Sequence, residues 1–148
     1  MTTGQGEIAT GQSDGLAPKM LAARLATAFY VGWGLLHLIA ARGIYDLAST
    51  APEGLARARL EQGAWNLALF ALQAMAVATL LNWHNNRIGY WLNIIIVGVV
   101  DLLYVLLLIV PGYIPASLAA WAGPITYLIA ATFSTAGFLR RDLAPPDY

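Results

Sequence analysis

Apolar residues along this chain gather into four long stretches separated by short polar segments. A helix needs about 20 mainly apolar residues to cross the hydrocarbon core of a bilayer. Four stretches reach that length, at residues 21–41, 63–82, 88–110 and 117–139. The pattern therefore predicts four transmembrane helices.

The polar segments between these stretches carry residues that end helices. Residues 42–62 contain Pro52, and their later part, residues 53–61, is expected either to form a short surface helix or to extend the second span. Residues 83–87 indicate a tight polar turn, and the prolines and glycine of residues 111–115 end the third span. Short connections make sequential helices antiparallel, so the predicted fold is an all-α, integral membrane four-helix bundle in up-down order.

The composition is that of a protein surrounded by lipid. Hydrophobic residues make up 59% of the 148 residues and charged residues 11%, against roughly 25% charged residues in a typical soluble domain. We expect one membrane domain at residues 19–141, between a flexible polar tail at residues 1–18 and a C-terminal tail at residues 142–148. The net charge of zero provides no field for nucleic acid, and the absence of cysteine excludes thiolate chemistry.

The distribution of basic residues predicts the orientation. The side of the membrane that holds both predicted termini and the turn at residues 83–87 carries five of the eight basic residues: Lys19, Arg24, Arg87, Arg140 and Arg141. The opposite side carries Arg42, Arg57 and Arg59. Because basic flanks stay in the cytoplasm, we expect a multi-pass protein of the inner (cytoplasmic) membrane with both termini cytoplasmic.

Asp101 is the most informative polar residue, because it lies well inside the third predicted span. At 1.5 Å per residue it sits roughly 14 Å from the outer end of that span, and Asn93 and Tyr104 share its helical face. A charged group in hydrocarbon costs several kcal/mol and faces the bundle interior. Asp101 is interpreted either as a proton-carrying or ligand-orienting carboxylate, or as a structural acid that fixes helix packing.

Polar residues of the first two spans extend this candidate site. Asn66 and Gln73 share one face of the second span, and a hydrogen bond between Gln73 and Asp101 is expected at about equal depth. His37 lies about 6 Å from the outer end of the first span and is either a proton shuttle, a single metal or haem ligand, or a hydrogen-bonded packing residue. The predicted intrabundle polar site comprises His37, Asn66, Gln73, Asn93, Asp101 and Tyr104.

No catalytic residue, metal site or cofactor is predicted. His84 lies in the turn near the opposite surface from His37, roughly 30 Å away, so the two histidines cannot ligate one haem. The chain contains no HExxH motif, no glycine-rich phosphate loop and no GxSxG elbow. A hydrolase or a nucleotide-dependent enzyme is therefore not indicated.

The segment Arg24-Leu-Ala-Thr-Ala-Phe-Tyr-Val-Gly-Trp-Gly-Leu-Leu-His37-Leu resembles the first span of DoxX-like small four-helix bacterial membrane proteins. The resemblance implies a bacterial inner-membrane protein, in some cases a subunit tied to quinone-linked redox chemistry. It assigns no role to any individual residue of this chain.

Two functions are consistent with the sequence. The first is an accessory or structural subunit of a membrane complex, with lipid and protein subunits or a second copy of the chain as partners and no nucleic acid. The alternative is binding or transport of a small lipophilic molecule, such as a lipid or a quinone, or of protons, in a polar cavity that Trp33 and Tyr104 help to line.

Overall fold

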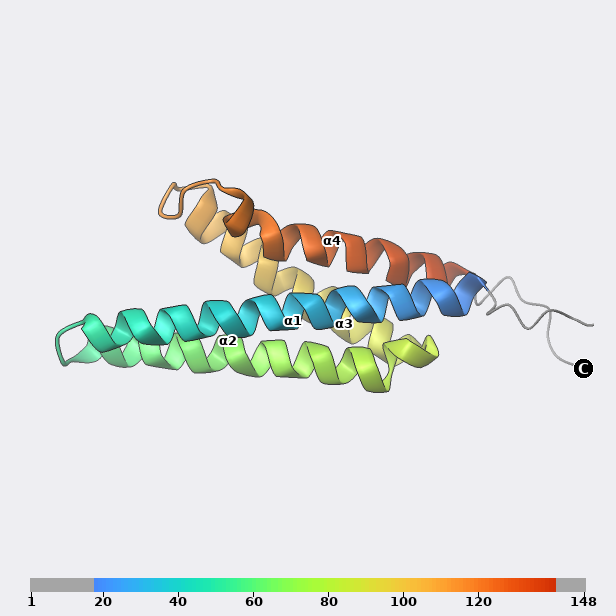
Figure 1. Ribbon diagram of the computed structural model, residues 1–148, viewed down its shortest axis with the longest axis horizontal. Helices are drawn as coiled ribbons and strands as arrows, with labels where there is room; N and C mark the ends of the chain where they lie inside the picture. Colours follow the sequence, from blue (N-terminus) through green and yellow to red (C-terminus); the bar gives the residue numbers. More distant parts are fainter. Residues whose placement is uncertain (1–17, 141–148) are drawn as a thin grey trace, which may run out of the picture.

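The computed structural model describes residues 18–140, and this part of the chain is helical without strands. Four long helices dominate it (Figure 1): α1 Pro18–Thr50, α2 Leu55–Leu80, α3 Arg87–Tyr104 and α4 Leu118–Leu139. A short 3₁₀ helix, η1, spans Asn82–His84, and a π-helical segment, η2, continues α3 over Val105–Ile109. The predicted all-α class is confirmed, and all four long helices have the length and composition to cross a membrane.

Both predicted tails lie almost wholly outside the described residues, as does Arg141. The one exception is Pro18, which is the first residue of α1. Proline suits the first position of a helix because its fixed φ is already helical and the N–H it lacks would have no partner there.

The first two helices are longer than the predicted spans. α1 continues past residue 41 to Thr50, and α2 begins at Leu55, directly after Gly54 at φ 146°. The alternative in which residues 53–61 extend the second span is therefore the one the structure adopts. Ion pairs form along both helices here, between Arg42 and Asp46 on α1 and between Arg57 and Glu61 on α2.

The turn predicted at residues 83–87 is confirmed. It consists of η1, followed by Asn85 in the left-handed region at φ 53° and by Asn86 as the N-cap of α3. The Asn86 side chain accepts hydrogen bonds from Ile88 N and Gly89 N, which satisfies donors that have no partner within the helix. Asn85 Nδ2 donates to Gly137 O at 2.9 Å and so joins the turn to the end of α4.

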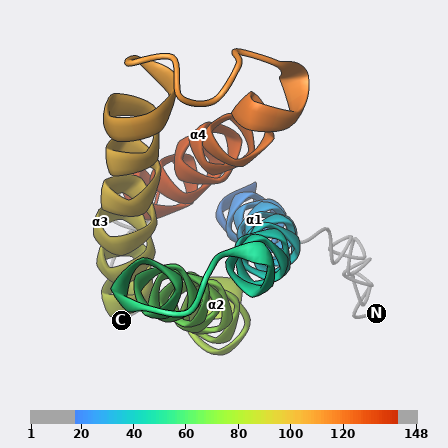
Figure 2. The same ribbon diagram turned by 90° about the vertical axis from the view of Figure 1, so that its left-hand side faces the viewer.

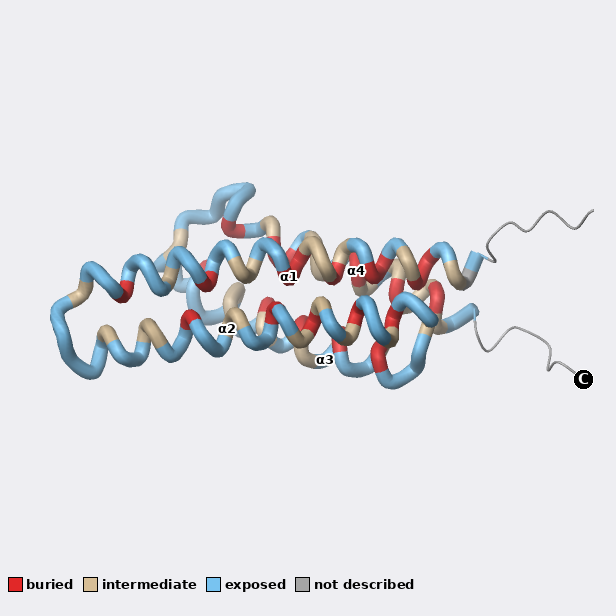
Figure 3. The backbone as a smooth tube through the Cα atoms, turned by 60° about the horizontal axis from the view of Figure 1, so that its bottom comes forward, coloured by how far each residue is buried: buried red, intermediate tan, exposed pale blue. Residues whose placement is uncertain are grey.

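The four helices surround a narrow interior. α1 packs against α2 on one side and α4 on the other, and α3 contacts α2 and α4 and lies diagonally across from α1 (Figure 2). α3 and α4 run obliquely to the α1–α2 pair, and the loop that joins α1 to α2 projects beyond the connection between α3 and α4 (Figures 1 and 2). Buried positions line the inward sides of the helices and thin out along this projecting hairpin (Figure 3).

Small residues let the helices approach closely, as the sequence predicts for the glycines and alanines of the spans. The buried residues of α2 are all alanines: Ala64, Ala71, Ala74 and Ala78. Opposite them, a Cβ on Gly34 would lie 2.7 Å from Met75 Sδ and 3.0 Å from Ala71 O. Trp33, Tyr30 and Val97 are the largest side chains of the buried hydrophobic core.

Gly89 and Gly43 form a matched pair that tests this close packing. A Cβ on Gly89 would lie 2.5 Å from Leu81 Cβ and 3.1 Å from Asn82 N, whereas a Cβ on Gly43 has no neighbour within 4 Å. We expect Gly89→Ala to lower the free energy of unfolding by about 1–3 kcal/mol through overpacking. Gly43→Ala should be neutral or stabilising by up to about 1 kcal/mol, since alanine favours helix. Thermal unfolding in detergent, followed by circular dichroism, measures both, and equal effects would contradict the packing.

Candidate functional site

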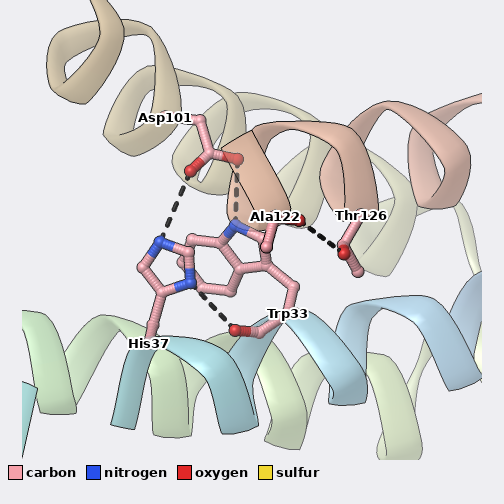
Figure 4. Close-up of polar contacts among 5 residues, drawn as sticks. All are labelled: Trp33, His37, Asp101, Ala122 and Thr126. Carbon is pink, nitrogen blue, oxygen red and sulfur yellow. Dashed lines mark hydrogen bonds and ion pairs between the residues drawn. The ribbon is translucent and has the colours of Figure 1, made fainter. Parts of the chain in front are cut away.

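Asp101 of α3 is buried and contacts two side chains of α1 (Figure 4). The indole N–H of Trp33 donates a hydrogen bond to Asp101 Oδ2 at 2.9 Å. His37 Nε2 lies 3.4 Å from the other carboxyl oxygen, Oδ1. The acid is therefore held between an aromatic donor and an imidazole, and both contacts span the diagonal of the bundle.

The helical spacing of Trp33 and His37 explains how α1 presents both groups. Residues four apart lie on one face of a helix, one turn above the other. Their rings stack with centroids 3.7 Å apart and planes 24° from parallel. His37 Nδ1 lies 2.9 Å from the carbonyl oxygen of Trp33, so the imidazole is anchored to its own helix and directs Nε2 towards Asp101 (Figure 4).

The backbone of α4 encloses the pair from a third side. A Cβ on Gly123 would lie 2.7 Å from His37 Cε1 and 3.6 Å from Asp101 Oδ1. Thr126 on the same helix donates to its own backbone at Ala122 O and does not take part in the cluster (Figure 4). Glycine at position 123 thus lets a helix backbone fill the space beside the imidazole.

The predicted hydrogen bond between Gln73 and Asp101 is wrong, because within residues 18–140 the acid bonds to α1 instead. Counting residues along a helix fixes depth but not rotation about the helix axis, and Gln73 is only half-buried. Asn66 is exposed on α2 and lies outside the interior, where the predicted polar site placed it.

Asn93 is buried, but its Nδ2 donates to Ala74 O at 3.3 Å, about 12 Å along α3 from Asp101 at 1.5 Å per residue. Tyr104 is half-buried one turn beyond the acid. The structure thus brings together His37 and Asp101, with Tyr104 on the next turn, and places the remaining predicted residues elsewhere.

Trp33 is the hydrogen-bond donor of the cluster, whereas the sequence predicted it only as a residue that lines a polar cavity. It is wholly buried, and the N–H of a buried tryptophan generally finds an acceptor. One signal in the sequence could have identified Trp33 as a partner of the acid. It lies four residues before His37, on the same helical face, and a buried indole N–H needs an acceptor.

The described residues supply only two ligating groups at this site, His37 and Asp101, and no group of three His, Asp or Glu side chains gathers in residues 18–140. Two surface grooves lie elsewhere. One, of about 340 Å³, follows the outer face of α3 from Arg87 to Ile96. The other, of about 230 Å³, lies between α1 and α2 and includes Tyr45 and Trp65.

Comparison with known proteins finds no family model, no curated protein and no solved structure that matches this chain. The resemblance of the first span to DoxX-like proteins therefore stays a prediction. The function of the protein has to be inferred from the residues of the chain alone.

A double-mutant cycle between Trp33→Phe and Asp101→Leu measures the bond that centres the cluster. In the wild-type background, Trp33→Phe leaves a buried carboxyl oxygen without its donor, which costs about 1–3 kcal/mol in addition to the lost ring volume. In the Asp101→Leu background that additional cost is absent, so the two effects should be non-additive by this amount. Unfolding by denaturant in detergent supplies the four free energies, and simple additivity would show that the bond contributes nothing.

Proposed function

We propose that the protein is a multi-pass protein of the cytoplasmic membrane, with four crossings in up-down order and both termini in the cytoplasm. The 22 residues of α4 measure about 33 Å, which matches a hydrocarbon core of roughly 30 Å. The outward face of α3 supports the same placement, since its exposed side chains include Ile88, Ile95, Val99 and Leu102. Such a surface is stable when lipid covers it.

Within that membrane we propose the role of an accessory subunit. It binds a partner subunit through the projecting α1–α2 hairpin, which comprises residues 42–65 at the end of α1 and the start of α2. The carrying observation is that this hairpin exposes large apolar side chains among charged ones. Trp65, Leu47 and Leu55 are each more than half exposed. They share the segment with the Arg42–Asp46 and Arg57–Glu61 ion pairs.

The length of α1 favours protein over lipid as the cover of this surface. Its 33 residues measure about 50 Å, some 20 Å more than the hydrocarbon core of roughly 30 Å. The charged residues from Arg42 onwards favour placing the surplus outside the hydrocarbon. Apolar side chains at that level are covered only at the interface or by protein, and contiguous exposed apolar surface marks protein contacts.

The interior supports a structural role for the polar cluster in this subunit. Trp33, His37 and Asp101 engage one another across the bundle, and Gly123 closes the space beside them. Interhelical polar contacts of this kind stabilise membrane bundles by roughly 0.6–2 kcal/mol. α1 and α3 lie diagonally opposite in the bundle and are not packed as neighbours. The cluster therefore supplies a direct contact between these two helices.

Single-cysteine labelling tests the topology, because the chain has no cysteine of its own. Three exposed positions report the connections: His84→Cys for the α2–α3 turn, Ser49→Cys for the projecting hairpin, and Ala116→Cys for the α3–α4 linker. In intact cells, a membrane-impermeant maleimide should label Ser49→Cys and Ala116→Cys at once and His84→Cys only after permeabilisation. Labelling of all three in intact cells would contradict four crossings, and the inverse pattern would reverse the orientation.

Photo-crosslinking in cells tests the subunit role. A photoreactive amino acid at position 65, on the hairpin, should yield a discrete adduct of higher mass, while the same residue at position 102, on the lipid-facing side of α3, should not. Trp65→Glu should abolish comigration of the protein with a larger assembly on native gels after mild extraction. A monomer on native gels together with no adduct at position 65 would refute the proposed role.

A further inference from the structure

The hydrogen positions on His37 follow from its neighbours. Nδ1 lies 2.9 Å from the carbonyl oxygen of Trp33, and a carbonyl oxygen only accepts. Nδ1 therefore carries a hydrogen. In a neutral imidazole the other nitrogen, Nε2, is then a bare acceptor, and it faces Asp101 Oδ1 at 3.4 Å.

Two acceptors cannot face one another favourably in a buried site. Asp101 Oδ1 is buried and has no hydrogen-bond donor within residues 18–140, while Oδ2 is occupied by the Trp33 N–H. A neutral His37 beside an ionised Asp101 would leave an unpaired negative charge in the interior, at a cost of several kcal/mol. One additional proton removes the conflict, whether it sits on Nε2 as imidazolium–carboxylate or on Oδ1 as imidazole–carboxylic acid.

Within residues 18–140, no other cation is placed to neutralise the acid. α4 contains no charged residue, and the Tyr127 hydroxyl on it is committed to Ile94 O at 3.0 Å. On α3 the nearest titratable neighbour of Asp101 is Tyr104. The arginines of α1 and α2 have other contacts: Arg42 with Asp46, Arg57 with Glu61, Arg59 with Gln62 and Arg24 with the ring of Trp83.

We propose that His37 and Asp101 form a proton-binding site that holds one shared, exchangeable proton inside the helical bundle. The proton moves between His37 Nε2 and Asp101 Oδ1, and the pair stays neutral in either position. His37 is the more exposed of the two side chains, at 11% against 5% for Asp101. The site does not depend on the partner-binding role, since it is a property of the isolated chain.

The bound proton has a mechanical consequence. With the proton in place, the His37–Asp101 contact attracts α1 to α3 across the diagonal of the bundle. Loss of that proton leaves a buried net negative charge, and gain of a second proton leaves a buried net positive charge. Both changes therefore disfavour the buried contact between α1 and α3.

Nuclear magnetic resonance of ¹⁵N-histidine-labelled protein in detergent, combined with infrared spectroscopy, tests the site. The chain has two histidines, and His84, exposed in the η1 turn, serves as the internal control. At mildly alkaline pH, we expect one of two signals from the pair. Either His37 keeps hydrogens on both nitrogens, or a protonated carboxyl band is present that Asp101→Asn removes.

Two variants complete the test. In Asp101→Asn, which retains an acceptor for Trp33, the shared proton is absent, so Nε2 of His37 should carry no hydrogen under the same conditions. In His37→Gln, the proton should reside on Asp101, so the protonated carboxyl band should be present at full intensity. A wild-type spectrum with a bare His37 Nε2 and an ionised Asp101, or a His37 that keeps hydrogens on both nitrogens in Asp101→Asn, would overturn the proposal.

Discussion

Asp101 brings a carboxyl group into the interior of four apolar helices, and the cost of keeping that group away from water governs what surrounds it. A charge in such a setting requires partners within the protein. Trp33 supplies a neutral donor to one oxygen, and His37 supplies a group that takes or yields a proton at the other. Gly123 keeps the α4 backbone close enough to shield both. Residues from three helices, far apart in the sequence, thus act together to keep this carboxyl group buried.

The contacts to Asp101 require that the helices approach one another closely. In lipid, helices gain little from burying apolar surface against one another, and association rests on packing and on polar contacts. The alanine face of α2 and Gly34 of α1 bring these two helices together. That contact fixes α1, and with it the direction in which Trp33 reaches. A fixed α1 is what allows two contacts of 2.9 and 3.4 Å to a single carboxyl group.

The helical architecture was predictable because the four apolar stretches have the length of a membrane-crossing helix, and because prolines, glycines and asparagines end helices locally. The continuation of α1 to Thr50 was missed because its charged residues looked like a connection rather than a helix surface. Asp101 and His37 were identified as important, but their pairing was not. Depth counted from residue 41 placed His37 too shallow, since α1 does not end there and α3 runs obliquely to it (Figure 2). Gln73 was preferred on depth alone, although only the rotation of each helix decides which side chains meet.

The order of the cluster along the chain bears on how the protein is made. Synthesis delivers the N-terminal residues first, so α1 with Trp33 and His37 precedes α3 with Asp101 by roughly sixty residues. An acid entering a bilayer alone is poorly tolerated, whereas here its donor and its base are already present in an earlier helix. Reversing the arrangement, with the acid on the first helix, would leave it without partners until the third had emerged. For the membrane insertion proposed above, this sequence order spares the nascent chain an unpaired charge.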